Sequence, residues 1–413
     1  MLVQKRKRSI RFATLFLVLL VLVGLAGSAF SQKSAGEFWD ASMLANVQMV
    51  TDDKMVKNWA RISPDGSKLI YNEFASDVLA LTDADVAKWM EAEPNTKLDQ
   101  LAKQVEQSGN LKPDEQKNLQ KNYQDALKKE IAARKKEFVR LTKSNTWQDK
   151  NKRLWILRKC GYPTANIVLL RNPAQPIKSP LVSGDAHAPS WVDNNIDYLY
   201  VSEEDDPPRL VRSSTAGGGK IFITRNPIGV DIGRPSVKDG IIVCDTWING
   251  KRQLVRLKAD GTAISKDHEG KDVMYHILGE GAQPSWHPRE NKFLYVRTIN
   301  RTGVRIIEEM DAETLQTHEI YKDTKFNSAY PSYSSCGRYI LFQKGIEAGS
   351  GKFKGNYWHI FLMKADGSGL TQLTSGAVNA YSPSMDANGN VYFIADAEVT
   401  EVYRARANTQ NIL

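Results

Sequence analysis

One pattern recurs along this chain of 413 residues and limits the folds open to it. A Pro-Ser pair is followed by an aromatic or apolar residue, a polar turn and an apolar run, as in Pro189-Ser190-Trp191 before Tyr198-Leu199-Tyr200-Val201. Copies start at residues 189, 235, 284, 331 and 383, and a degenerate copy starts at Ala60. Four of the five intervals lie between 46 and 52 residues, and the first is 129. Such a period indicates a repeat architecture in which neighbouring copies bury a shared core.

Each copy contains further apolar segments that are typical of strands. In the third copy they lie at residues 254–257 and 274–278, and the pair Asp260-Gly261 between them suits a tight hairpin turn. Four short antiparallel strands in about 40–50 residues are typical of a β-propeller blade. The sequence therefore predicts an all-β fold, a six-bladed β-propeller of four-stranded antiparallel blades.

The last copy, which starts at Pro383, lacks a fourth strand. Residues 47–51 can supply it, because they precede Ala60 by the same offset at which Thr374 precedes Pro383. A ring closed by strands from both ends of the chain removes exposed sheet edges, which otherwise pair with other chains. We therefore expect an N-terminal strand to complete the last blade.

The long interval after Ala60 carries an insertion between the second and third strands of the first blade. Residues 78–152 are predicted to be helical: residues 83–93 form a short helix capped by Thr82 or Asp83, and Pro113 opens a long helix. Six apolar residues mark one face of the long helix: Leu119, Tyr123, Leu127, Ile131, Phe138 and Leu141. Thirty helical residues extend about 45 Å. We expect a hairpin arm, either a cap on the propeller or a surface for a partner or membrane.

The formal charge of +9 is not spread evenly over the chain. Residues 1–31 carry five basic residues and no acidic one, and residues 95–152 carry 14 basic and 8 acidic residues. The remainder holds 37 basic and 39 acidic residues, which argues against a nucleic-acid-binding protein. The basic part of the arm, residues 112–143, is a candidate for contact with an anionic membrane or peptidoglycan.

The N-terminus has the layout of an export signal. Five basic residues between Lys5 and Arg11 precede the uncharged residues 12–30, and Ala29-Phe30-Ser31 fits the rule for cleavage before Gln32. An uncleaved anchor is the alternative, since an apolar run of this length can just span a bilayer. Both place the body outside the cytoplasm, in the periplasm or associated with the cell envelope. The expected domains are a signal peptide (1–31), a closing strand with the start of the first blade (32–77), the helical insertion (78–152) and the rest of the propeller (153–413).

Several of these segments resemble the repeat of TolB-like periplasmic propellers and of related WD-repeat-like propellers. They are Ser63-Pro64-Asp65-Gly66, the Pro-Ser-Trp openings and the segment from Met363 to Thr374. The resemblance covers about residues 44–77 and 160–413 and concerns the fold more than the function.

TolB proteins carry an α/β domain before the propeller, whereas residues 32–57 alone separate the signal from the repeats here. Their lipoprotein partner is therefore not carried over. Related prolyl-oligopeptidase-like enzymes add a hydrolase domain, whose Gly-x-Ser-x-Gly motif is absent from this sequence.

Residues that carry chemistry are sparse. The three cysteines and six histidines fit no metal motif, no phosphate loop occurs, and the acidic residues 203–206 are more typical of a solvated loop than of a Ca²⁺ site. We therefore expect no catalytic, cofactor-binding or metal residues. The resemblance places the Pro-Ser-Trp openings near the central channel, where five residues are candidates for binding at its mouth: His187, Trp191, Trp286, His287 and Tyr333. The alternatives are structural histidines and aromatic packing between blades.

These features favour an exported, non-enzymatic TolB-like propeller that acts as a protein-interaction scaffold in the cell envelope. Its expected partner is an envelope protein, with no nucleic acid and no cofactor. One alternative is an enzyme or glycan-binding protein that uses the channel mouth, because propellers host many activities. The other is a protein that associates with the membrane through its basic helical arm.

Overall fold

The structure is a computed structural model. It describes residues 38–52, 55–74, 78–144, 147–162, 166–183, 186–203, 208–224, 228–299, 302–348, 355–396 and 400–411. The expected signal peptide, residues 1–31, lies outside the described residues. Within the described part of the chain, no helix is both long and apolar enough to cross a membrane.

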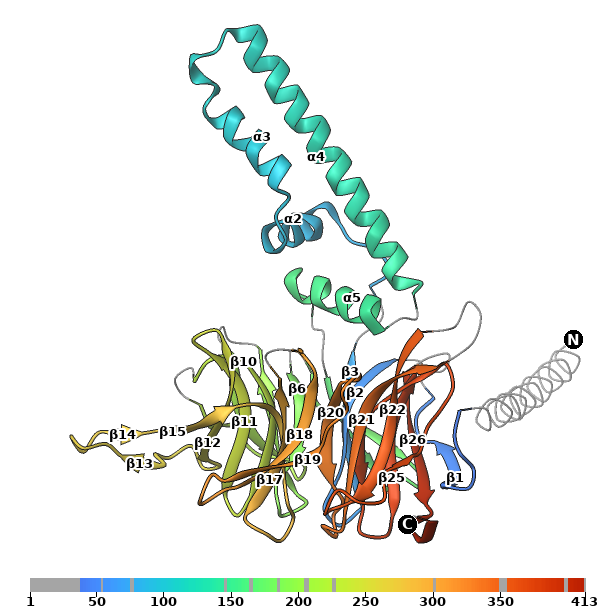
Figure 1. Ribbon diagram of the computed structural model, residues 1–413. Helices are drawn as coiled ribbons and strands as arrows, with labels where there is room; N and C mark the ends of the chain where they lie inside the picture. The colour runs from blue at the N-terminus through green and yellow to red at the C-terminus, as the bar shows by residue number, and fades with distance from the viewer. Residues whose placement is uncertain are drawn as a thin grey trace, which may run out of the picture.

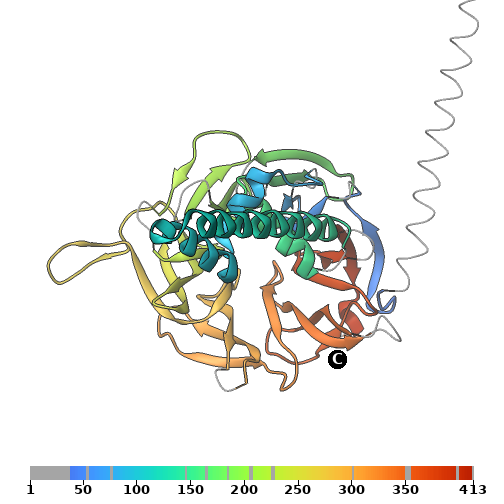
Figure 2. The ribbon, with the colours of Figure 1, turned by 90° about the horizontal axis from the view of Figure 1, so that it is seen from above.

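Six four-stranded antiparallel sheets stand around a central axis, which Figure 2 views from above. Their first strands pack beside one another around the ring, so each sheet is one blade of a propeller. The strands of blades 1 to 3, from the axis outward, are β2 (Val56–Ile62), β3 (Lys68–Phe74), β4 (Asn166–Arg171) and β5 (Ile177–Val182); β6 (Ala186–Trp191), β7 (Asp197–Ser202), β8 (Arg209–Ser214) and β9 (Ile221–Phe222); β10 (Val230–Lys238), β11 (Ile241–Ile248), β12 (Lys251–Lys258) and β15 (Tyr275–Glu280).

Blades 4 to 6 follow the same order and complete the ring. Their strands are β16 (Ala282–Trp286), β17 (Lys292–Thr298), β18 (Arg305–Asp311) and β19 (Thr317–Tyr321); β20 (Ser328–Tyr333), β21 (Tyr339–Ala348), β22 (Gly355–Lys364) and β23 (Thr371–Gln372); β24 (Asn379–Met385), β25 (Asn390–Asp396), β26 (Thr400–Ala407) and β1 (Leu44–Met49). The six-bladed propeller predicted from the repeats is therefore the observed fold.

The second strand of each blade is apolar over consecutive residues because neighbouring blades cover both of its faces. In β7, Tyr198, Leu199, Tyr200 and Val201 are all buried. Leu199 and Val201 belong to the apolar cluster shared with blade 3, whereas Tyr198 and Tyr200 belong to the cluster shared with blade 1. The hydrophobic core is thus a series of inter-blade layers.

The N-terminal strand closes the ring as predicted. Strand β1 pairs antiparallel with β26 of blade 6, with Leu44 opposite Ala407 and Met49 opposite Tyr403. The strand begins and ends slightly before the predicted residues 47–51, and beyond it Val50 N donates to Val402 O over 2.7 Å. Blade 6 is therefore built from both ends of the described chain.

A buried ion pair joins blade 1 to blade 6 beside this closure. Lys57 Nζ of β2 lies 3.0 Å from Glu401 Oε2 of β26, and each side chain is at most 1% exposed. The Thr51 hydroxyl donates to the same carboxylate, and Lys57 Nζ also donates to Met55 O over 2.8 Å. The seam between the first and last blades is thus fastened by charge as well as by β1.

The insertion between β3 and β4 is helical and projects from one end of the ring (Figure 1). Its helices are α2 (Asp83–Ala92), α3 (Thr96–Glu106), the short 3-10 helix η1 (Ser108–Asn110), α4 (Pro113–Thr142) and α5 (Trp147–Lys159). The predicted cap of α2 is confirmed: the Thr82 hydroxyl accepts from Asp85 N, and the Asp85 carboxylate accepts from Thr82 N. The predicted start of the long helix at Pro113 is also confirmed.

Two elements depart from the sequence-based expectation. The boundary expected at residue 152 lies inside α5, so the helical insertion continues beyond it; Ile156 and Leu157 of this helix are buried against Trp89 and Phe138. Blade 3 carries an extra hairpin, β13 (Ser265–Lys266) and β14 (Asp272–Val273), which protrudes from the rim (Figure 2). Two-residue strands are too short to show a period in the sequence. Outside the blades, a last 3-10 helix, η3 (Thr409–Asn411), follows β26.

One buried histidine makes the stability of the ring sensitive to acid. His359 of β22 is fully buried, and its Nδ1 lies 3.3 Å from Thr374 Oγ1. Burial lowers the pKa of His359 from 6.5 to about 4. Between these values the unfolded chain binds more protons than the folded one, so stability present above pH 6.5 is lost as the pH falls towards 4.

We expect the free energy of unfolding of the wild-type protein to be about 2–3 kcal/mol lower at pH 4.5 than at pH 7, at about 1.36 kcal/mol per pKa unit. Urea unfolding of the wild type and of His359→Gln at both pH values measures the effect, because the glutamine variant lacks the titrating group. The variant should lose less stability than the wild type on acidification. Equal losses would contradict the assignment.

Candidate functional site

Every first strand carries a β-bulge at the same point of the repeat. The register between first and second strands shifts there in all six blades, for example between His187 and Ser190 in blade 2. The residue before the Pro-Ser position has a positive φ of 46–59° in each blade; these residues are Trp59, Ala188, Arg234, Gln283, Tyr330 and Ser382. A non-glycine residue in this region is strained, and a bulge re-aims the side chains around it. Six equivalent bulges therefore shape the inner wall.

Polar side chains of alternate blades hold these bulges in place. Asn72, Asp245 and Gln343 occupy equivalent positions on the second strands of blades 1, 3 and 5. Each bonds to the first strand of the next blade. Asn72 Nδ2 donates to Ala186 O over 2.6 Å, Gln283 N donates to Asp245 Oδ1 over 3.0 Å, and Ser382 N donates to Gln343 Oε1 over 3.1 Å. Buried backbone groups near the axis are thereby satisfied.

The bulges surround a cavity of about 100 Å³ in the channel. It is lined by Trp59, Arg61, Ala188, Pro189, Ser190, Arg234, Pro235, Ser236, Pro284, Ser285 and Ser332. Arg234 is held from the side: its Nη2 donates to Tyr330 Oη over 3.1 Å, its guanidinium lies 4.9 Å from the Tyr330 ring, and its Nη1 is 3.5 Å from Asp245 Oδ2. The cavity is therefore small, polar and positively charged.

None of the five residues predicted for the channel mouth lines this cavity. The His187 ring lies 5.5 Å from that of Trp59, which does line it. Its Nε2 is 2.6 Å from Glu203 Oε1, and Arg158 of α5 approaches the same carboxylate to 2.7 Å. Burial acts to raise the pKa of Glu203, but His187 and Arg158 hold that pKa below its usual value. Glu203, which both side chains contact, therefore links blade 2 to the base of the arm.

The other four predicted residues lie between blades. Trp191 donates from Nε1 to Arg61 O over 3.0 Å, and Trp286 packs edge-on against Phe293. The Tyr333 hydroxyl donates to the buried Glu309 carboxylate. These three aromatic residues belong to the inter-blade core clusters, which is the packing alternative that the sequence left open.

His287 has a structural position in a turn at the end of blade 4. Its Nδ1 accepts from the backbone of Glu290 over 2.9 Å, and its ring meets that of Tyr333 edge-on at 4.7 Å. Burial lowers the pKa of His287, which favours the neutral ring that can accept this bond. His187 and His287 are thus not brought together into one site.

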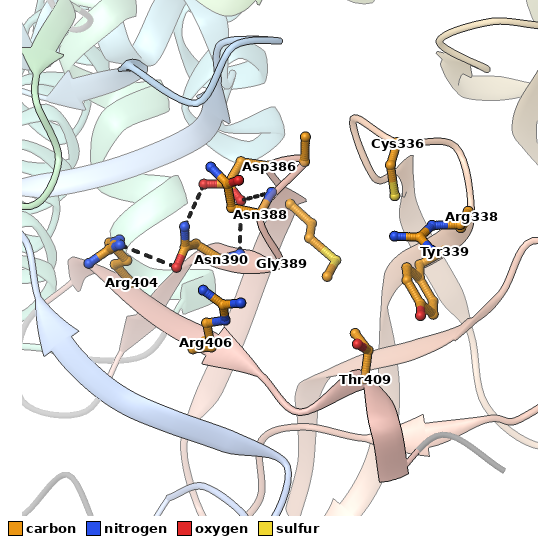
Figure 3. Close-up of a pocket in the computed structure, with 12 residues that line it drawn as sticks. Cys336, Arg338, Tyr339, Asp386, Asn388, Gly389, Asn390, Arg404, Arg406 and Thr409 are labelled. Carbon is orange, nitrogen blue, oxygen red and sulfur yellow. Dashed lines mark hydrogen bonds between the residues drawn. The ribbon is translucent and has the colours of Figure 1, made fainter.

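A second pocket, of about 500 Å³, lies between blades 5 and 6 (Figure 3). Arg338, Arg404 and Arg406 line it together with Asp386 and Asn390. Arg404 Nη2 donates to Asn390 Oδ1 over 3.2 Å, and Asn390 Nδ2 donates to Asp386 Oδ2 over 2.7 Å. Three guanidinium groups beside one carboxylate make this pocket positive. Sequence reasoning missed it because its residues come from strands and loops of two blades and lie far apart in the sequence.

Cys336 stands at the rim of the same pocket and is partly exposed. Burial acts to raise its pKa, but contacts with Ser334 and Arg338 hold that pKa below the usual value. Across the described residues, no group of three His, Cys, Asp or Glu side chains is placed to hold a metal ion.

The arm presents a lysine-rich face. In α4, Arg134 pairs with Glu130, Lys135 with Asp83, and Arg140 with Glu137 and Asp149. Five exposed lysines of α4 form no ion pair with a described carboxylate: Lys117, Lys121, Lys128, Lys129 and Lys136. At 100° per residue they cluster on the side of α4 opposite its apolar stripe.

No known protein-family model matches the chain, and no curated protein matches its sequence. Similar solved structures include a putative TolB from Agrobacterium tumefaciens, 19% identical with a TM-score of 0.42, covering 54% of this chain and 75% of that one. TolB from Acinetobacter baumannii is 13% identical with a TM-score of 0.42, covering 59% and 60%. Oligogalacturonate lyase from Vibrio parahaemolyticus is 13% identical with a TM-score of 0.40, covering 58% and 72%. The chain thus spans about three fifths to three quarters of these proteins, and the likeness concerns the fold alone.

Proposed function

We propose that the protein is an exported, non-enzymatic scaffold that binds a protein partner in the cell envelope through its helical arm. The observation that carries this proposal is that the ring does not need the arm in order to close. Glu73 of β3 pairs directly with Asn166 of β4, so a short turn could join these strands. The insertion instead places a 30-residue helix outside the propeller (Figure 1).

The base of the arm is well packed, whereas its outer part leaves apolar surface accessible. Trp89, Phe138 and Ile156 are buried in a core of the arm's own at its base, and Arg158 ties α5 to blade 2. Further along α4, Leu119, Tyr123, Leu127 and Ile131 are only partly buried. A well-packed base with a partly covered apolar stripe suits a helix that packs against a partner.

The proposal is tested by replacing residues 75–165 with Asn-Gly, which leaves a three-residue loop between the paired Glu73 and Asn166. The shortened protein should keep a cooperative unfolding transition, because blade 1 retains its four strands. A photo-crosslinking amino acid at the exposed position Asn122 of the full-length protein should trap an envelope protein in cells. The same label at Lys266, on the protruding hairpin of blade 3, is the control and should not trap it.

Crosslinks from both positions, or from neither, would contradict a partner site on the arm. The five exposed lysines of α4 favour a second candidate, contact with an anionic membrane or peptidoglycan. Flotation of the full-length and shortened proteins with anionic vesicles separates the two: loss of flotation on shortening, without a crosslinked protein, supports the surface contact. Such attraction should weaken at high salt.

A further inference from the structure

The repeat is broken at one position of the inner wall. Five blades carry a serine after the bulge: Ser190, Ser236, Ser285, Ser332 and Ser384. Blade 1 carries Arg61 there. The registers show that the positions are equivalent, because Arg61 pairs with Ile70 on the second strand as Ser190 pairs with Leu199. A long cation therefore replaces a small hydroxyl in one layer of the channel.

Arg61 reaches the same cavity as Arg234, which comes from the bulge layer of blade 3. Both residues line the space of about 100 Å³, together with four of the five serines. A single water needs roughly 10–15 Å³ of such space. The cavity thus has room for several non-hydrogen atoms between two guanidinium groups and a set of hydroxyl donors.

The positive charge of this cavity is not balanced by the carboxylates around it. Arg61 donates from Nη1 to Ala60 O over 3.2 Å, and no carboxylate among the described residues forms an ion pair with it. Asp245, which faces Arg234 at 3.5 Å, is closer to Arg252, whose Nε donates to it over 2.5 Å. Arg234 and Arg252 therefore share Asp245, and Arg252 Nη1 also donates to Asp231 over 2.5 Å, which leaves the charge of Arg61 without a paired carboxylate among the described residues.

Arg61 remains a cation at neutral pH. Burial, opposed by Tyr330 and reinforced by Arg234, lowers the pKa of Arg61 to about 10, which is still well above 7. Arg61 is partly buried, and withdrawing a cation from bulk water without a counter-charge carries a cost. Bringing an anion into the cavity would offset this cost.

We propose that the channel cavity binds a small oxyanion, either inorganic phosphate or sulfate or the carboxylate of a larger molecule, between Arg61 and Arg234. A guanidinium offers paired N–H donors that match two oxygens of such a group. The serine hydroxyls of the neighbouring blades supply further donors. The site differs from the arm, so it neither requires nor replaces the proposed scaffold role.

Isothermal titration calorimetry of the purified protein at constant ionic strength tests this proposal, with inorganic phosphate, sulfate and acetate as separate probes. We expect at least one probe to bind at a single site, and acetate distinguishes a carboxylate ligand from an inorganic one. Arg61→Ser restores the serine of the other five repeats and should fold, but should bind the same probe at least tenfold more weakly. Arg406→Ser, in the pocket between blades 5 and 6, is the matched control and should bind as the wild type does.

A second readout uses Trp59, which lines the cavity. Iodide, an anion that quenches indole fluorescence, should quench a component that disappears in Trp59→Phe and is protected by the bound probe. Absence of binding for all three probes, or unchanged affinity in Arg61→Ser, would overturn the proposal. Weakened binding in Arg406→Ser would place the anion in the other pocket and would also overturn it. If Arg61→Ser did not fold, iodide quenching of Trp59 in the wild type would decide the question.

Discussion

Replacing Lys57 with alanine is expected to lower the free energy of unfolding by about 3–5 kcal/mol, the usual cost of removing one partner of a buried ion pair. Lys57 and Glu401 lie 3.0 Å apart and are almost completely withdrawn from water. Without the ammonium group, the Glu401 carboxylate keeps the Thr51 hydroxyl but loses the positive charge of Lys57. Urea unfolding followed by circular dichroism at pH 7 measures the difference.

Two controls separate burial from charge. Lys325→Ala removes an exposed lysine that lies 4.0 Å from Glu347 and should change stability by less than about 1 kcal/mol. The double variant Lys57→Met/Glu401→Leu removes both buried charges and should recover much of the loss, because apolar residues of similar volume replace such pairs well. A Lys57→Ala variant as stable as the wild type would show that the pair does not fasten the seam.

Deleting residues 44–52 is expected to destabilise the protein by more than about 4 kcal/mol. The deletion removes β1 and exposes the edge of β26, and it takes away the buried Leu44 and Val50. A buried aliphatic side chain contributes about 1.5–3 kcal/mol, and each lost backbone hydrogen bond about 0.5–1.5 kcal/mol. The exposed edge should also promote association between molecules. Calorimetry and size-exclusion chromatography measure these two effects.

Deletion of residues 265–273 is a control of the same length. It removes the hairpin β13–β14, which protrudes from the rim of blade 3 (Figure 1). Because Ile264 N donates to Val273 O over 2.8 Å, the two ends of the deletion lie close together. This variant should unfold within about 1 kcal/mol of the wild type. Similar losses in both deletions would mean that β1 has no special part in closing the ring.

The sequence predicts the elements whose signal is local. The Pro-Ser openings and apolar runs locate the blades, and the proline and apolar stripe locate α4 from its first residue. The N-terminal strand is also predictable, because a ring with one incomplete blade needs a partner from the other end of the chain. Helix α5 was partly missed because its apolar residues do not form a clear stripe in the sequence.

The inner wall could not be predicted to the same degree. A bulge inserts one residue into a strand of period two, so the side chains on either side of it change faces. The side chains of Trp191, Trp286 and Tyr333, which stand at the starts of their repeats, therefore point between blades. The side chains of Arg61 and Arg234 instead reach the channel. Arg61 and Arg234 belong to blades 1 and 3, and only the closed ring places their guanidinium groups near one cavity.

The hydrogen bonds from Asn72, Asp245 and Gln343 recur at every second junction of the ring. Each of these side chains lies on an odd-numbered blade and bonds to the even-numbered blade that follows. The apolar residues Val201, Val296 and Ile394 take the equivalent positions on the even-numbered blades. The junction from blade 4 to blade 5 has a bond of another kind, because Tyr330 N donates to the side-chain Oε1 of Gln283, which lies on the first strand. The six junctions are therefore not interchangeable, and a blade moved to another place in the ring would meet a neighbour with different polar partners.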